Sequence, residues 1–191
     1  MIVATLGDSI TEGSPLLHRT EGGDPRSSWQ YWASQADPSL QFRVSGVYGE
    51  RTDEIAERLE ECARGADVLV VQGGINDVAQ GRSVVEAAAN LRAMIRRGRE
   101  LVPRVVTVDM LPWNNGYPRA EPEIRRLNEL IREMAAAESV AVLPFHDTLE
   151  DPERPGRMRP DWTDDGDHPS IEGYRRLGDV IAESLATFRE I

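Results

Sequence analysis

Four short segments of this sequence carry residue types that could together perform nucleophilic catalysis. In the first, Gly7-Asp8-Ser9 directly follows the apolar run Ile2–Leu6. A serine at a strand-to-helix turn can present its hydroxyl at the edge of a sheet, where a helix N-terminus favours developing negative charge. The same residues allow a second interpretation, because Ser9-Ile10-Thr11-Glu12 also fits a capping box in which Ser9 only begins a helix.

Two further segments offer hydrogen-bond donors. Gly46-Val47-Tyr48-Gly49 follows the second apolar run, and glycine lets a backbone N–H approach a ligand without hindrance. Gly73-Gly74-Ile75-Asn76-Asp77 follows the third run, and the side-chain amide of Asn76 can donate to an oxyanion. Taken singly, each segment is better explained as a tight turn before a helix.

The fourth segment supplies a base and a carboxylate. Asp165 and His168 lie three residues apart, just before a helical pattern. The carboxylate can hold one imidazole nitrogen while the other nitrogen faces a nucleophile. A plain Asp-Gly turn with an exposed His168 is the simpler alternative. His146, beside Asp147, is a second candidate base, and His18 is a third.

The stretch from Asp161 to Glu172 also resembles a calcium-binding loop, with Gly166 at the sixth position and Glu172 at the twelfth. Three features argue against this interpretation. Thr163 stands where Asp or Asn is usual, the prolines upstream cannot form the entering helix, and the chain has no partner loop. We therefore predict that no metal ion binds there.

The elements that would position these segments alternate between strand and helix. Apolar or β-branched runs predict strands at Ile2–Leu6, Gln41–Val44, Val68–Val71, Val105–Met110 and Val140–Leu143. Helical patterns lie near Ser28–Gln35, Thr52–Cys62, Ser83–Leu101, Glu123–Ala137 and Ile171–Thr187. The strand runs are nearly continuous in apolar character, which is typical of a parallel sheet covered on both faces. We predict one α/β/α domain over residues 1–191, with the polar segments gathered at one edge of its sheet.

Two segments between these elements are loop-like, Ser14–Ser27 and Glu150–Asp167. Both flank candidate catalytic residues, so we expect them to form walls or lids of a site. The single cysteine, Cys62, excludes an internal disulfide and is expected to fill space in a helix.

The composition excludes several classes of function. A net charge of −11 disfavours nucleic acid and anionic membranes as partners. All 22 basic residues are arginine, which excludes Schiff-base lysines and the lysine of P-loops. No stretch approaches the roughly 20 apolar residues of a membrane span. The first residues also lack the pattern of a signal peptide, so the expected location is the cytoplasm, unless the chain is a trimmed secreted form.

In this order, the four segments together resemble the SGNH (GDSL) hydrolases. Gly7-Asp8-Ser9 is similar to the first block of that family, and Gly49 to the glycine of the second. The third and fourth blocks are matched by Gly74-Ile75-Asn76-Asp77 and by Asp165, His168, Pro169 and Ser170, with Gly173 and Tyr174 behind them. One departure is Val44, which stands where the second block often has asparagine.

The resemblance implies a three-layer α/β/α sandwich with a central, mostly parallel five-stranded sheet, of the flavodoxin-like type. It also implies a metal-free esterase, lipase, thioesterase or carbohydrate deacetylase. Ser9 would attack an ester carbonyl, His168 would transfer the proton, and Asp165 would fix the imidazole. The oxyanion would be held by the N–H groups of Ser9 and Gly49 and by the Asn76 amide. No cofactor is expected, and the expected partner is a small-molecule ester.

The residues around the predicted site favour a short-acyl ester of a polar alcohol, such as an acetylated carbohydrate. Trp113 and Asn114 follow the fourth strand, and Trp162 precedes Asp165, so we expect all three to contact the substrate. No long apolar run is present near the site to line an acyl groove. A lysophospholipase or acyl-thioesterase is the enzymatic alternative.

A flavodoxin-like binding module is the non-enzymatic alternative. Ser9 and Thr11 would then hold a phosphate, but Asn76, Asp165 and His168 would have no role. A carbohydrate-binding relative without activity is disfavoured because all the chemical residues are present. The sequence leaves the oligomeric state open.

Overall fold

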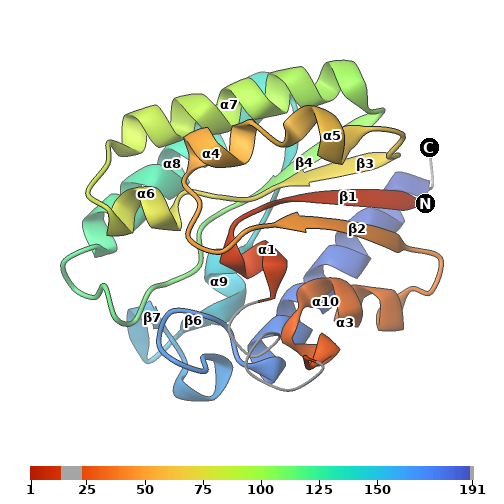
Figure 1. The fold of residues 1–191 in the computed structure, drawn as a ribbon. Coiled ribbons are helices and arrows are strands. Elements are labelled where there is room, and N and C mark those ends of the chain that lie inside the picture. Colours follow the sequence, from red (N-terminus) through yellow and green to blue (C-terminus); the bar gives the residue numbers. More distant parts are fainter. Residues whose placement is uncertain (14–22, 190–191) are drawn as a thin grey trace.

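A five-stranded parallel sheet forms the middle of the protein (Figure 1), as the sequence predicts. The computed structural model describes residues 1–13 and 23–189. The strands are β1 (Ile2–Gly7), β2 (Gln41–Gly46), β3 (Val68–Val71), β4 (Arg104–Val108) and β5 (Ala141–Leu143). They lie in the order β2-β1-β3-β4-β5, and all neighbouring pairs are parallel.

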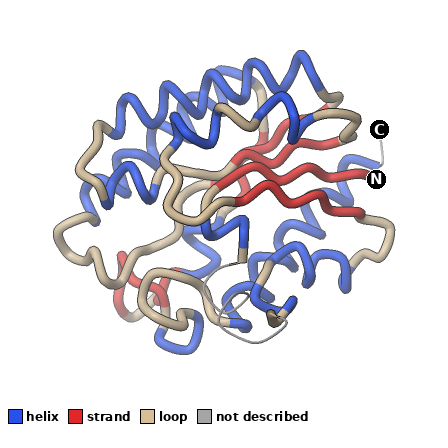
Figure 2. The backbone as a smooth tube through the Cα atoms, viewed as in Figure 1, coloured by secondary structure: helices blue, strands red, loops and turns tan. Residues whose placement is uncertain are grey.

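Helices cover both faces of this sheet, which gives the predicted α/β/α sandwich (Figure 2). One layer contains α4 (Thr52–Ala56), α5 (Leu59–Ala63), α7 (Val84–Leu101) and α8 (Glu121–Glu138). The other layer contains α3 (Trp29–Ala36), α9 (Phe145–Leu149) and α10 (Ile171–Ala186). Two short helices, α1 (Ser9–Glu12) and α6 (Ile75–Ala79), follow β1 and β3 directly.

Each helical layer buries its own apolar core against the sheet. The buried positions of α7 and α8 recur every three or four residues, so each helix turns one apolar face inward. That core includes Leu69, Leu91, Ile95, Leu127 and Ile131. The core on the opposite face includes Val106, Trp29, Phe145, Tyr174 and Leu177. These two cores hold the strands rigidly, so that the strand ends can carry functional side chains.

β2 departs from the expectation that the strands are covered on both faces. It is an edge strand, and most of its residues are at least partly exposed, with Val44 51% exposed. Its sequence contains Gln41, Arg43 and Ser45, which suit a strand that meets water. The expectation of full burial is correct for β1, β3 and β4, whose residues are nearly all buried, but it also fails for β5, the other edge strand, where only Leu143 is buried.

Three other elements differ from their predicted form. The helix predicted over Thr52–Cys62 is divided into α4 and α5. β4 ends at Val108, one residue before Asp109, whose carboxylate accepts hydrogen bonds from the backbone N–H of His146 and from the guanidinium of Arg132. The segment predicted as a loop over Glu150–Asp167 contains an antiparallel hairpin, β6 (Glu150–Asp151) with β7 (Arg154–Met158). Much of the other predicted loop, including His18, lies outside the described residues.

The order of the strands explains where a site can form. The chain passes from β1 to β2 on one side and then returns to β3 on the other side of β1. At such a switch point the connections after the strands diverge, which leaves a crevice at the carboxyl ends of the strands. Ser9 follows β1 and Asn76 follows β3, so both lie at this crevice. Within residues 1–13 and 23–189, no helix has the length and apolar character to cross a membrane.

Candidate active site

Ser9 stands at the sharp turn that follows β1. Asp8 is the cap of α1, since its Oδ1 atom accepts a hydrogen bond from the backbone N–H of Ile10 at 3.0 Å. The alternative in which Ser9 caps this helix is therefore wrong. Gln72, just after β3, fixes the turn from below, because its Oε1 atom accepts hydrogen bonds from the N–H of Asp8 and the hydroxyl of Thr11.

Asp8 is a buried group whose importance the sequence did not indicate. Burial raises the pKa of its carboxyl group from 3.8 to about 6, although the hydrogen bond from Ile10 acts in the opposite direction. Its Oδ2 atom has no hydrogen-bond partner among the described residues. Asp8 caps the helix behind Ser9, but ionisation of its buried carboxyl group at neutral pH reduces the stability of the fold.

Three of the predicted side chains form one hydrogen-bonded chain. The Oγ atom of Ser9 lies 3.0 Å from Nε2 of His168, and Nδ1 of His168 lies 3.0 Å from Oδ2 of Asp165. Ser9 and His168 are buried, with 4% and 8% of their surfaces exposed. His168 precedes α10 and is 159 residues from Ser9 in the chain, so the fold itself brings them together.

Asp165 is held by the backbone as well as by the imidazole. Its Oδ1 atom accepts hydrogen bonds from the N–H of Asp167 at 2.9 Å and of His168 at 2.8 Å. Partial burial acts to raise the pKa of Asp165, but these bonds and the His168 imidazole hold that pKa below its ordinary value. Asp165 is therefore ionised at neutral pH and stabilises positive charge on the imidazole beside it.

Tyr48, which the sequence analysis did not predict, is a neighbour of His168. Its ring stacks on the imidazole of His168, with a centroid distance of 6.1 Å and an interplanar angle of 27°. Tyr48 is 65% exposed and precedes Gly49 in the second segment. The sequence signal for Tyr48 is its position between Gly46 and Gly49, because glycines mark a turn of the backbone close to the predicted site.

The two predicted donors outside the triad are joined through one loop. Gly49 has a φ of +80°, a conformation that favours glycine, and open space surrounds the position where a Cβ atom would be. Asn76 donates one N–H of its amide to the backbone oxygen of Glu50 at 2.9 Å. The second N–H of that amide has no partner among residues 1–13 and 23–189, so it can donate to a ligand.

Asp77 strengthens this connection. Its carboxylate accepts hydrogen bonds from the N–H of Thr52 at 3.0 Å and from the Thr52 hydroxyl at 2.8 Å. Burial raises the pKa of Asp77, while the hydrogen bonds from Thr52 oppose that effect. Neighbouring residues of the third segment thus bind both ends of the Glu50–Thr52 stretch and fix it relative to α6.

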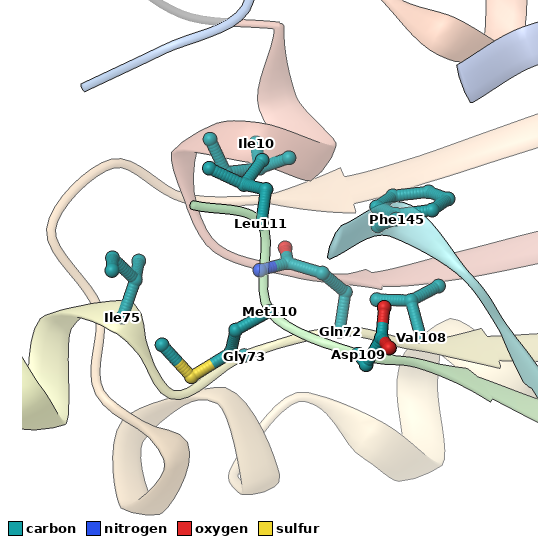
Figure 3. Close-up of a pocket in the computed structure, with 9 residues that line it drawn as sticks. All are labelled: Ile10, Gln72, Gly73, Ile75, Val108, Asp109, Met110, Leu111 and Phe145. Atoms are coloured by element: carbon teal, nitrogen blue, oxygen red, sulfur yellow. The ribbon is translucent and has the colours of Figure 1, made fainter. Parts of the chain in front are cut away.

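The pocket at Ser9 is small, and both polar and apolar side chains line it. Its volume is about 150 Å³, and it is lined by Ser9, Ile10, Tyr48, Ile75, Asn76, Ala79, Trp113, Asp167 and His168. Ile10 and Ile75 also line a second space, between the ends of β3 and β4 (Figure 3). That space measures about 10 Å³, which is room for about one water molecule. The pocket therefore has no deep extension in this direction.

The three residues expected to contact substrate lie in different surroundings. Trp113 lines the pocket at Ser9, and its Nε1 donates to Asp167 at 2.5 Å. Asn114 uses both atoms of its amide on the backbone of Met158, at 2.7 and 3.0 Å, so it positions a loop. The ring of Trp162 packs against the guanidinium groups of Arg159 and Arg176 and does not line the pocket. Of the three, Trp113 alone is placed to meet a ligand at Ser9.

The competing sites of the sequence analysis lie elsewhere or do not form. His146 is on α9 and faces a different depression, with Arg125 and Arg132, so it is no base for Ser9. Among the described residues, one group of His, Cys, Asp and Glu side chains converges closely enough to hold a metal ion, namely His146, Asp147 and Glu150. No such group forms in the described stretch from Asp161 to Glu172, where the Asp165 carboxylate faces His168 instead.

Comparison with known sequences identifies one family. A profile of the GDSL-like Lipase/Acylhydrolase family matches residues 5–176, which is most of the chain. Among curated proteins, none matches the chain significantly.

Solved structures show the same fold. A G-D-S-L family lipolytic protein from Veillonella parvula has 21% identity and a TM-score of 0.82, with 97% of this chain and 98% of that chain covered. An acetylxylan esterase from Geobacillus stearothermophilus has 17% identity and a TM-score of 0.74, with 96% and 93% covered. A protein from Streptococcus pneumonia, provisionally described as a platelet activating factor, has 27% identity and a TM-score of 0.76, with 96% and 83% covered. The first two likenesses concern the fold alone.

Proposed function

Because this chain belongs to the GDSL-like lipase/acylhydrolase family, we propose that it is a serine esterase acting on short-acyl esters of polar alcohols, such as acetylated carbohydrates. The observation that carries this proposal is the hydrogen-bonded chain from Ser9 through His168 to Asp165 beside an open pocket. It supplies a nucleophile, a general base and an orienting carboxylate within hydrogen-bonding distance of one another.

In the proposed reaction, Ser9 Oγ attacks the ester carbonyl carbon while its proton passes to Nε2 of His168. The tetrahedral intermediate then collapses, and His168 returns that proton to the departing alcohol. Asp165 holds Nδ1 of the imidazole, so that Nε2 faces Ser9 and the transient imidazolium is stabilised. A water molecule attacks the acyl-enzyme in the same way, which releases the acid and restores the Ser9 hydroxyl.

The negative charge of the intermediate needs donors that are fixed before the reaction begins. We assign this role to the N–H groups of Ser9 and Gly49 and to the free N–H of the Asn76 amide. The support for Asn76 is its place in the pocket and the bond from its other N–H to Glu50, which prevents the amide from rotating.

The size of the pocket favours a short acyl group. Ile10 and Ile75 limit its depth, and the space behind them accepts about one water molecule. An acetyl group needs little room beyond the carbonyl, whereas the acyl chain of a lysophospholipase or long-chain thioesterase needs a continuous apolar groove. One structural relative is an acetylxylan esterase, which agrees with an acetyl group on a polar alcohol.

The test is a series of p-nitrophenyl esters from acetate to decanoate, measured with wild type and Ser9→Ala. We expect kcat/KM to be highest for acetate or butyrate. Ser9→Ala should lower kcat by on the order of 10⁴ or more, while the control Ser34→Ala, on α3, should keep full activity. A kcat/KM that rises beyond octanoate would favour the lysophospholipase or thioesterase alternative. Full activity of Ser9→Ala would end the proposal.

A further inference from the structure

We propose that a groove beside the catalytic pocket binds the alcohol half of the ester, and that this alcohol is a neutral oligosaccharide. The inference rests on the proposed esterase function and adds the identity of the leaving group. The groove lies between α6 and the segment 113–123 and has a volume of about 720 Å³. That volume falls within the usual range for ligand sites, about 300–1,000 Å³, whereas the pocket at Ser9 has about 150 Å³.

The groove lies next to the catalytic pocket. Trp113 and Ala79 line both of them, so the two spaces meet at these side chains. On the acyl side, Ile10 and Ile75 restrict the pocket to a short group. An ester with its carbonyl at Ser9 therefore has room for its larger half on the Trp113 side.

The lining of the groove suits sugar rings better than an alkyl chain. Trp113 and Tyr117 offer aromatic surfaces, on which the apolar faces of sugar rings can pack. Arg119 and Glu123 are exposed at the groove, and neither has a hydrogen bond or ion pair within the described part of the chain. Their donors and acceptors are therefore available to the hydroxyl groups around such rings.

The aromatic surfaces are fixed before any ligand binds. The indole N–H of Trp113 donates to Asp167, and Gly116 lies so close to the indole that a Cβ atom there would come within 2.1 Å of it. The guanidinium of Arg157 covers the Tyr117 ring at 4.1 Å from its centroid. Side chains held in this way lose little conformational entropy on binding, which favours affinity for a ligand of matching shape.

The same segment also holds the loop of the triad. The amide of Asn115 donates to the backbone oxygen of Asp165 at 2.9 Å, and the N–H of Asn114 donates to Gly166 at 3.0 Å. A ligand in the groove thus rests on the residues that position Asp165 and His168. Binding of the alcohol half is therefore coupled to the alignment of His168 through these hydrogen bonds.

The charge of the molecule identifies which oligosaccharides fit. With a net charge of −11, the protein repels polyanions such as uronic acid polymers. At the groove itself, Arg119 and Glu123 carry opposite charges and provide no net attraction for either sign. A neutral glycan satisfies both conditions.

The experiment compares kcat/KM for partially acetylated trisaccharides of glucose, xylose and mannose with kcat/KM for p-nitrophenyl acetate. In Arg119→Ala and in Tyr117→Ala, we expect the best trisaccharide to lose on the order of tenfold relative to p-nitrophenyl acetate, mainly through KM. Arg64→Ala is the matched control. It removes another exposed arginine without an ion pair among the described residues, at the opposite edge of the sheet, and should keep the wild-type ratio.

Calorimetric titration of Ser9→Ala with the same trisaccharides measures binding without turnover, and Arg119→Ala in that background should weaken it about tenfold. Unchanged ratios and unchanged binding in both groove variants would overturn the inference. A selective loss on p-nitrophenyl octanoate would also overturn it, since the groove would then hold an acyl chain. If Ser9→Ala instead kept full esterase activity, the proposed function would fail, and the titration would still decide the groove separately.

Discussion

The Asn76 amide has two tasks, and Asn76→Ala removes both of them. One N–H of its amide binds Glu50, and the other is proposed to bind the oxyanion. We expect Asn76→Ala to lower kcat by roughly 10²–10³ with little change in KM, because the lost interaction forms in the transition state. Steady-state kinetics with p-nitrophenyl acetate measures this.

Asn90→Ala is the matched control for that substitution. The Asn90 amide donates to the Thr52 hydroxyl at 3.1 Å and lies outside the pocket, so its loss should leave kcat near that of wild type. If Asn76→Ala reduced stability but turned over normally in the folded protein, Asn76 would be a purely structural residue.

Asp8 makes the stability of the protein depend on pH. Its pKa is raised from 3.8 to about 6, so the folded state binds this proton more tightly than the unfolded state. Stability contributed by Asp8 is therefore present at low pH and is lost as the pH rises from about 4 to about 6. Above about pH 6, the raised pKa of Asp8 lowers the free energy of unfolding by roughly 3 kcal/mol relative to its value at low pH.

Asp8→Asn keeps a capping side chain but removes the charge. We expect its free energy of unfolding to exceed that of wild type at pH 8, and the difference to shrink at pH 4. Urea denaturation of both proteins at the two pH values measures the difference. An Asp8→Asn variant that is less stable than wild type at pH 8 would show that the buried carboxylate is stabilising.

For single residues, the sequence predicted which residues form the site better than it predicted which atoms they contact. Ser9, Asp165 and His168 were predicted because their spacing relative to strands and helices is characteristic, and the structure brings them together. Asn114 was expected to face a ligand, but its amide pairs with the backbone of Met158. Tyr48 was not predicted. The partners of these two side chains come from distant segments, which no local pattern specifies.

Among the secondary-structure elements, one arginine joins the strand ends that carry the site. The guanidinium of Arg58 donates to the backbone oxygen of Gly7 at 3.0 Å and of Ser45 at 2.7 Å, and it pairs with Glu50. It therefore connects β1, β2 and the loop that contains Gly49. Arg58 lies between α4 and α5, at the point where the predicted single helix is divided.

We expect Arg58→Ala to destabilise the fold by roughly 2–4 kcal/mol, because it leaves partly buried carbonyl groups and a carboxylate without their donor. In the protein that remains folded, kcat should fall, since Gly49 and Ser9 lose their fixed separation. Chemical denaturation and kinetics well below the melting temperature measure the two effects.

Arg97→Ala serves as the comparison for Arg58→Ala. Arg97 is half-exposed and forms ion pairs with Glu60 and Glu100, which are themselves exposed. Such surface pairs contribute about 1 kcal/mol or less. Equal effects of the two substitutions on stability and kcat would show that Arg58 does not hold the strand ends together.

For most helices and strands, the type of element was predicted correctly, and the errors concerned the residues at which the element begins or ends. All five strands were predicted from apolar or β-branched runs, and the long helices α7, α8 and α10 from helical patterns that extend over many residues. β4 was predicted to reach Met110 but ends at Val108, and the carboxylate of the next residue, Asp109, binds His146 and Arg132. The hairpin of β6 and β7 was missed because its prolines and glycine are typical of a loop. Both segments form hydrogen bonds with distant residues, which a local pattern does not specify.

At the scale of the whole molecule, the charge acts on every approaching ligand. A net charge of −11 with arginine as the only basic residue type creates a field that repels anions. We expect kcat/KM for an anionic ester, such as a p-nitrophenyl hemisuccinate, to rise with ionic strength as this field is screened. For p-nitrophenyl acetate it should stay constant. A salt response of the same size for both esters would contradict this expectation.

The function proposed from the fold, the triad geometry and the pocket depends on one claim, that Ser9 is the covalent nucleophile. A fluorophosphonate probe reacts with an activated serine and leaves a stable mass tag. The chain has no lysine, so trypsin releases its N-terminal peptide by cleavage after Arg19, and that peptide contains Ser14 as well as Ser9. Fragmentation spectra must therefore locate the tag. We predict that the tag lies on Ser9 and disappears in Ser9→Ala and His168→Ala. A tag on any other serine, with Ser9→Ala fully active, would contradict the account.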